Sequence, residues 1–325
     1  MEKRKNRKRK LLIPLFLSTF LLMTTTFAWF SANRMVSIDA LNVHVQTDGG
    51  LEVSTNAIDW KQVVTVGDIQ NARSKYAGSV NQIPYQMLQM SSGGNINNGK
   101  LELFNGTATN ADADNYILTA ERKNETESFG EESEGGFIAF DVFFRVKSSK
   151  ELYLDGSSKV EYTGESNSGI ENATRIAFLN EGSSDDNPNI SQNLSNATKS
   201  VMWEPNYDVH TQYGVSHASM VYGLTTTQTG ATRLDYDGVV AEIPSSNNVS
   251  VSNANANTYP GLFRRVNIDV ATAKNNSGNQ KILDLSPSVT KVRIYMWIEG
   301  QDVDCEDSAS YGDISFDLKF TINPS

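Results

Sequence analysis

Two segments near the C-terminal end, 291–300 and 313–322, alternate apolar and polar side chains with a period of two. In the first, the apolar positions are Val292, Ile294, Met296 and Ile298. In the second, they are Ile314, Phe316, Leu318, Phe320 and Ile322. Such alternation is typical of a β-strand that buries one face, because successive side chains point to opposite sides. We expect these two strands to form an antiparallel pair that closes a hydrophobic core.

A third alternating segment lies in the middle of the chain, over 137–147. Its apolar face consists of Ile138, Phe140, Val142, Phe144 and Val146. Shorter strand candidates are 151–154, 159–163, 174–179 and 200–203. Within residues 68–90, the side chains of Ile69, Ala72, Tyr76 and Val80 fall at helical spacing and predict one short helix. Many strands and few helices predict an all-β fold, namely an antiparallel β-sandwich or jelly roll with long loops.

The N-terminal segment has the layout of a secretory signal peptide. A basic stretch, MEKRKNRKRK, precedes the apolar run LLIPLFLSTFLLM, and a small residue, Ala28, follows after a short polar stretch. This order predicts a signal peptide over 1–28 that is cleaved between Ala28 and Trp29. The alternative is an uncleaved anchor, a hydrophobic helix over 11–30, which has no charged residue and is long enough to span a bilayer.

Both interpretations place the rest of the chain outside the cytoplasm. We expect it to be extracellular or at the cell surface, and to be membrane-anchored if the signal is not cleaved. Residues 29–325 are long enough for a single large β-sandwich domain with its own core. Within this range, about 180–280 is rich in Asn, Ser, Thr and Gly and predicts a loop-rich elaboration of the main sheets.

The charge of the chain is divided unevenly between its two parts. The first ten residues hold seven of the 28 basic residues and one of the 38 acidic residues, which leaves the remainder with a net charge of −16. A domain this acidic does not suit nucleic-acid binding, which depends on basic side chains that neutralise phosphates. Cys305 is the single cysteine, so no intrachain disulfide can form. Exported domains without disulfides are typical of Gram-positive bacteria.

The first segment after the signal carries a pattern of its own, FAWFSANRMVSIDALNVHV over 27–45. Apolar alternation changes phase near Ala40, which predicts a strand with a bulge. This segment resembles the processing region of the TasA/camelysin family of exported Gram-positive proteins. There, a signal peptide ending in a small residue precedes an aromatic pair, a polar spacer and the first strand. In addition, VRIYMWIEGQDVDCED is similar to the C-terminal end of Firmicute surface proteins with the same layout.

The resemblance implies a jelly-roll-like β domain, removal of the signal by a dedicated signal peptidase, and assembly into extracellular fibres of the biofilm matrix. In such fibres, the N-terminal strand of one subunit fills a groove in the next. The donor-strand residues here would be Val36, Ile38, Leu41, Val43 and Val45. An unpaired sheet edge can accept such a strand through main-chain hydrogen bonds. The alternative is that this strand is simply the first strand of its own domain.

The loop between the two C-terminal strands is acidic. Its candidate calcium ligands are Asp302, Asp304, Glu306 and Asp307. Closely spaced carboxylates suit Ca²⁺, which takes six to eight oxygen ligands. The glycine and terminal glutamate of the EF-hand pattern are missing, so a solvated acidic loop is the alternative. The sequence indicates no other cofactor.

No pattern in the sequence indicates a catalytic centre. The three histidines, His44, His210 and His217, do not form an HExxH motif. The acidic neighbours of Cys305 would raise the pKa of its thiol and weaken it as a nucleophile. We therefore expect a non-enzymatic structural or interaction protein whose partners are copies of itself or cell-surface polymers. The alternative is a membrane-anchored adhesin or carbohydrate-binding surface domain, with Trp60, Trp203, Trp297 and Tyr207 as candidate sugar-binding aromatics.

Overall fold

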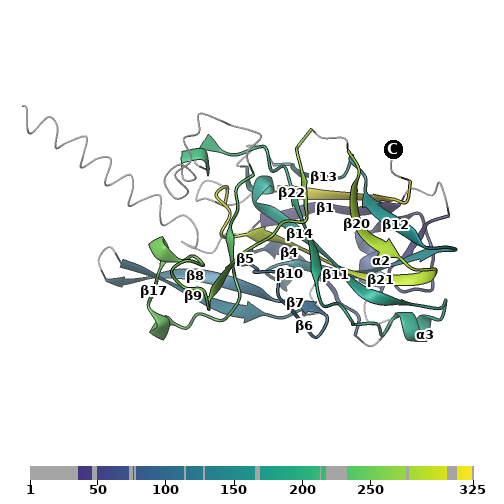
Figure 1. Cartoon of the computed structure of the whole chain (residues 1–325), viewed down its shortest axis with the longest axis horizontal. Coiled ribbons are helices and arrows are strands. Elements are labelled where there is room, and N and C mark those ends of the chain that lie inside the picture. Colours follow the sequence, from purple (N-terminus) through teal and green to yellow (C-terminus); the bar gives the residue numbers. More distant parts are fainter. Residues whose placement is uncertain are drawn as a thin grey trace, which may run out of the picture.

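The computed structural model is all-β, as predicted, and its strands form two sheets that face each other as a sandwich (Figure 1). The residues described are 36–45, 50–72, 76, 78–112, 115–126, 129–164, 169–212, 214–216, 233–275, 278–305 and 313–323. The predicted N-terminal hydrophobic helix lies outside these residues. The predicted short helix is α2 (Val66–Ala72), which includes Ile69 and Ala72. Tyr76 and Val80 lie beyond its end, and β4 (Asn81–Met87) occupies much of the remaining range.

We call the two layers sheet A and sheet B. Sheet A contains β1 (Val36–Val45), β3 (Val63–Thr65), β4 (Asn81–Met87), β10 (Phe129–Glu134), β12 (Lys150–Leu154), β13 (Lys159–Tyr162), β20 (Gln280–Leu285) and β22 (Asp313–Thr321). Sheet B contains β2 (Glu52–Ser54), β5 (Gln89–Ser91), β8 (Leu103–Asp112), β9 (Asn115–Lys123), β11 (Ile138–Val146), β14 (Thr174–Ser184), β15 (Ser200–Pro205), β17 (Val249–Ser250), β19 (Val270–Thr272) and β21 (Ser288–Glu299). Strand β4 also pairs with β11, so the 18 strands form one hydrogen-bonded system.

The remaining elements are short. They are β6 (Ile96–Asn97), β7 (Lys100–Leu101), β16 (Asp237–Val239), β18 (Phe263–Arg265), α3 (Pro188–Ser191) and the 3-10 helices η1 (Ile170–Ala173), η2 (Ser245–Asn247) and η3 (Val251–Asn253). Strands β6 and β7 form one hairpin, and β16 pairs with β18.

The predicted pairing of the two C-terminal strands is wrong, although both strands exist. Strand β21 lies in sheet B between β11 and β14, whereas β22 lies in sheet A beside β1, β12 and β13. Each has one strongly apolar face, and two such faces bury the most surface when they oppose each other across a sandwich. Phe320 of β22 accordingly meets Phe144 and Phe178 of sheet B edge-on, at 5.3 and 5.9 Å between ring centroids.

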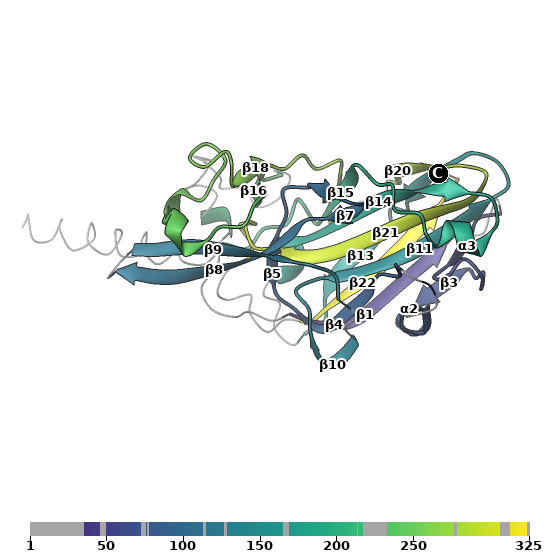
Figure 2. The ribbon, with the colours of Figure 1, turned by 90° about the horizontal axis from the view of Figure 1, so that it is seen from below.

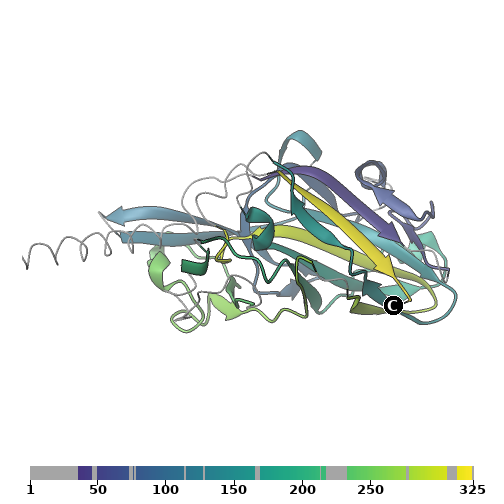
Figure 3. The same cartoon turned by 90° about the horizontal axis from the view of Figure 1, so that it is seen from above.

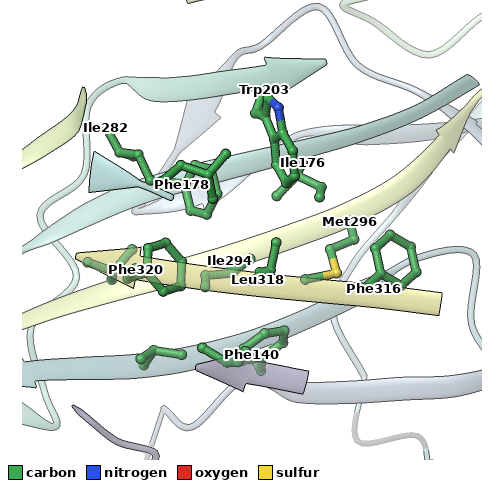
Figure 4. Close-up of a cluster of buried hydrophobic side chains, with 14 of the residues drawn as sticks. Phe140, Ile176, Phe178, Trp203, Ile282, Ile294, Met296, Phe316, Leu318 and Phe320 are labelled. Carbon is green, nitrogen blue, oxygen red and sulfur yellow. The ribbon is translucent and has the colours of Figure 1, made fainter. Parts of the chain in front are cut away.

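Figure 4 shows part of this core, in which Phe316, Leu318 and Phe320 of β22 belong to one cluster with side chains of sheet B. The sandwich is also not purely antiparallel, because β1 runs parallel to β22, as Figure 3 shows. The pairs β4–β10, β5–β21 and β15–β19 are parallel as well.

Strands β8 and β9 form a hairpin that extends away from the sandwich (Figure 2). Residues 236–263, which we call the lobe, pack on its base and form a separate apolar cluster around Phe104, Leu118 and Phe263. The lobe belongs to the region predicted as a loop-rich elaboration. Strands β15, β17 and β19 of that region belong to sheet B.

Candidate functional site

Strand β1, the candidate donor strand, lies inside sheet A of its own chain. It pairs in parallel with β22 and antiparallel with β3, so both of its edges carry hydrogen-bonded partners. Leu41 and Val43 are buried in the main core at 1% and 0% exposure. The register shift between Ile38 and Ala40 confirms the predicted bulge. The backbones of Val36 and Val45 form the two ends of the strand.

The predicted cleavage residues, Ala28 and Trp29, lie outside the described residues. Cleavage therefore stays a prediction. Within the part of the chain that the structure describes, no helix is long and apolar enough to cross a membrane.

The candidate calcium ligands are only partly described, because Glu306 and Asp307 fall outside the described residues. Asp302 is bound by the guanidinium of Arg175. The Oδ2 atom of Asp304 lies 2.8 Å from Nδ1 of His210. Both carboxylates are buried, so this part of the loop is not solvated. No group of three or more acidic, histidine or cysteine side chains among the described residues could hold a metal ion.

The outer face of sheet B carries a layer of buried charges that the sequence analysis missed. Period-two alternation predicts that the polar face of β21 meets solvent, yet Lys291, Arg293 and Glu299 are at most 2% exposed. One signal could have indicated this burial: Tyr295 and Trp297 lie on the same face, and such large aromatic side chains favour a covered surface. The apolar covering of Tyr295 and Trp297 includes Ala197 in the segment after α3, Tyr236 in the lobe, and Val266 and Ile268 just after it.

Asp141 on β11 is the centre of the first group of charges. Its Oδ1 accepts a hydrogen bond from Arg293 Nε at 2.8 Å, and its Oδ2 lies 3.2 Å from Lys291 Nζ. The hydroxyl of Tyr76 also donates to Oδ2, at 2.8 Å. Burial favours the neutral acid, but the charges of Arg293 and Lys291 outweigh it and hold the pKa of Asp141 below its usual value.

Glu181 on β14 belongs to the same group, but its carboxylate has fewer hydrogen-bond partners than that of Asp141. Its Oε2 accepts the backbone N–H of Ala197 at 3.2 Å. Its Oε1 has no hydrogen-bond partner among the described residues and lies 3.9 Å from an Arg293 nitrogen. The side chain is fully buried, and burial raises its pKa to about 7.

Arg175 on β14 is the centre of the second group. One terminal nitrogen donates to the carbonyls of Asn172 and Thr174, at 3.2 and 2.9 Å. The other donates to Glu204 Oε1 at 2.8 Å and to Asp302. Burial disfavours the guanidinium charge, but these two carboxylates outweigh burial and raise the pKa of Arg175.

Glu299, at the end of β21, is fully buried beside this group. It accepts hydrogen bonds from the indole N–H of Trp297 at 3.0 Å and from the backbone N–H groups of Ser92 and Gln301 at 3.3 and 3.1 Å. Burial nevertheless raises its pKa to about 7. In chemical terms, the first group ties the segment after α3 to sheet B, and Arg175 ties β14 to β15 and to the loop after β21. The two groups present no paired nucleophile and base among the described residues.

The candidate sugar-binding aromatics are mostly covered. Trp203 and Trp297 are completely buried, which rules them out as exposed stacking platforms. The guanidinium of Arg145 covers Trp60 at 4.2 Å from the ring centroid. Near this pair, an open cleft of about 490 Å³ is lined by Gly50, Glu52, Arg145, Val146, Lys147, Asp186, Pro287 and Ser288. Within it, Arg145 already pairs with Glu52 and Asp186, at 2.8 and 2.9 Å.

No protein-family model, curated protein or solved structure matches this chain.

Proposed function

We propose that this chain is an exported, non-enzymatic structural or interaction protein of the bacterial cell surface or extracellular matrix, and that it assembles with copies of itself through β1. The observation that carries the proposal is the position of β1. It is the first strand of the sandwich, it follows the predicted signal peptide, and it fills a slot between β22 and β3.

The contacts of β1 are those that a strand from another copy could reproduce. Both edges of β1 are held by main-chain hydrogen bonds, which do not depend on side-chain identity. Leu41 and Val43 insert between the sheets, so an empty slot would expose core and two strand edges. Exchange of an identical strand between copies keeps every native contact, which makes it a low-cost route to assembly.

A non-enzymatic role is supported by the way in which the potential catalytic groups are used. Asp141, Asp302 and Asp304 each bind a basic side chain of the same chain. Cys305 is completely buried. These intrachain contacts support a structural role for the three carboxylates.

The first test is the N-terminal sequence and assembly state of the protein from its native cell fraction. A mature start at Trp29 together with large, regular assemblies would support the proposal. A start at Met1 in the membrane fraction, with monomers, would overturn it and favour the anchored adhesin or carbohydrate-binding domain.

A second test fixes β1 in its own chain. Asn42 lies opposite Asp317 in the register of β1 and β22, so the double change Asn42→Cys and Asp317→Cys places a disulfide across this pair. The oxidised variant should stay monomeric and assemble after reduction. The matched control is Glu161→Cys with Ser315→Cys, which links β13 to β22 and leaves β1 free to exchange. Equal assembly of both oxidised variants would contradict strand exchange.

A further inference from the structure

Residues 192–199, which we call the strap, follow α3 and cross the outer face of sheet B. Two buried residues of the sheet, Lys291 and Glu181, hold them there. Lys291 Nζ donates to the carbonyls of Gln192 and Leu194, at 2.9 and 3.0 Å. Glu181 accepts twice: its carbonyl from the N–H of Asn196 at 3.1 Å, and its Oε2 from the N–H of Ala197 at 3.2 Å.

The turn between β6 and β7 closes over the strap from the other side. The hydroxyl of Ser195 donates to the carbonyl of Asn98 at 3.3 Å. Gly99 lies so close that a Cβ atom there would stand 2.3 Å from Ser195 Oγ and 2.9 Å from Glu181 Oε2. The carboxylate of Glu181 is therefore enclosed between sheet, strap and turn, where solvent does not reach it.

The two cations near Glu181 lie closer to another carboxylate, Asp141, because Arg293 is 3.9 Å from the Glu181 carboxylate but 2.8 Å from that of Asp141. Strand β21 contributes Arg293 and Lys291, and β11 contributes Asp141, which lies within 3.2 Å of both cations. The strap offers only the Ala197 N–H, since its single charged residue, Lys199, is exposed.

The turn offers no cation to Glu181 either, because Lys100 pairs with Glu125 at 2.8 Å. One Glu181 oxygen therefore has no hydrogen-bond partner among the described residues. Enclosing such a charge is costly.

We propose that Glu181 is a pH-sensitive latch for the strap: protonated Glu181 keeps the strap closed on sheet B, and ionised Glu181 favours a state in which the strap has lifted and water reaches the carboxylate. A lifted strap also frees Lys291 from Gln192 and Leu194, so the covered face of sheet B opens at this point.

The direction of the pH effect follows from proton linkage. With the strap closed, burial raises the pKa of Glu181 from 4.5 to about 7, whereas a hydrated carboxyl returns to the lower value. The closed state therefore binds the proton more tightly. Its advantage is complete below about pH 4.5 and is lost as the pH rises through about 7. The lifted fraction should rise roughly tenfold to a hundredfold between about pH 5 and pH 8.

Hydrogen exchange at the amides of Asn196 and Ala197 tests the latch in the full chain. After correction for intrinsic base catalysis, the protection of these amides should fall from about pH 5 to pH 8. A local readout is needed because Glu299 also has a pKa raised to about 7 but lies elsewhere. Amides of β22 in sheet A serve as the internal reference.

Two variants and one titration test whether Glu181 controls the strap. Glu181→Gln, a neutral mimic of the protonated acid, should make strap protection independent of pH. Glu161→Gln, an exposed change on sheet A, should leave the wild-type pH dependence in place. Wild-type strap protection that does not change with pH, or a pH dependence that persists in Glu181→Gln, would overturn the latch. So would a Glu181 carboxyl resonance that titrates near 4.5.

Discussion

The buried guanidinium of Arg175 is the most sharply testable element of the outer-face charge layer. It is completely buried and donates to two carbonyls and two carboxylates. Arg175→Met keeps much of the volume and removes the charge. Glu204 and Asp302 would then lie in a closed environment without their common cation, and Glu204 Oε2 already lacks a hydrogen-bond partner among the described residues.

The expected cost follows from the asymmetry of buried ion pairs. A buried pair adds little net stability relative to apolar residues, but removal of one partner leaves an uncompensated charge and costs about 3–5 kcal/mol. For a domain of this size, such a loss lowers the melting temperature by roughly 10 °C. The cost should shrink at acid pH, because the two carboxylates can then become neutral in the variant.

The chain provides a matched control for this prediction. Arg145 also bridges two carboxylates, but Glu52 and Asp186 are 45% and 47% exposed. Arg145→Met should therefore cost only about 1 kcal/mol or less, apart from its contact with Trp60. Equilibrium unfolding in urea measures both variants. Equal losses, or a loss below about 1 kcal/mol for Arg175→Met, would refute the argument from burial.

Three further predictions concern packing and pH. Gly238→Ala should lower the free energy that holds the lobe in place by at least about 2 kcal/mol and speed its proteolysis, because the new Cβ would lie 2.1 Å from a backbone carbonyl. Gly261→Ala should be neutral, because its new Cβ meets nothing within 4 Å. Phe320→Ala should cost about 3–5 kcal/mol in urea unfolding, since its ring contacts two phenylalanines of sheet B. The pKa of Glu299 is raised to about 7, so the free energy of unfolding should fall as the pH rises from 4.5 through about 7. In Glu299→Gln this fall should be smaller by about 2–3 kcal/mol, and an unchanged pH profile would contradict the assignment.

Local patterns predicted the most regular strands of this protein, but not the hairpin β8–β9 or strand β20. The alternation of β11, β21 and β22 is confirmed, and so is the bulge of β1 near Ala40. Each depends only on which side of a strand successive side chains face, and this is fixed within a few residues. The acidic balance and the basic, apolar N-terminal segment are likewise properties of the sequence itself, and the prediction of export rests on them.

Only the tertiary structure decided which strands meet and which faces are covered. Whether β22 pairs with β21 or with β1 depends on contacts between residues far apart in the chain, and alternation is the same in both cases. The burial of Arg293 and Glu299 likewise depends on segments such as the strap and the lobe, whose own sequences show no regular period. A charged side chain on a strand predicts a polar face, but only the packing of distant segments decides whether water or another layer covers that face.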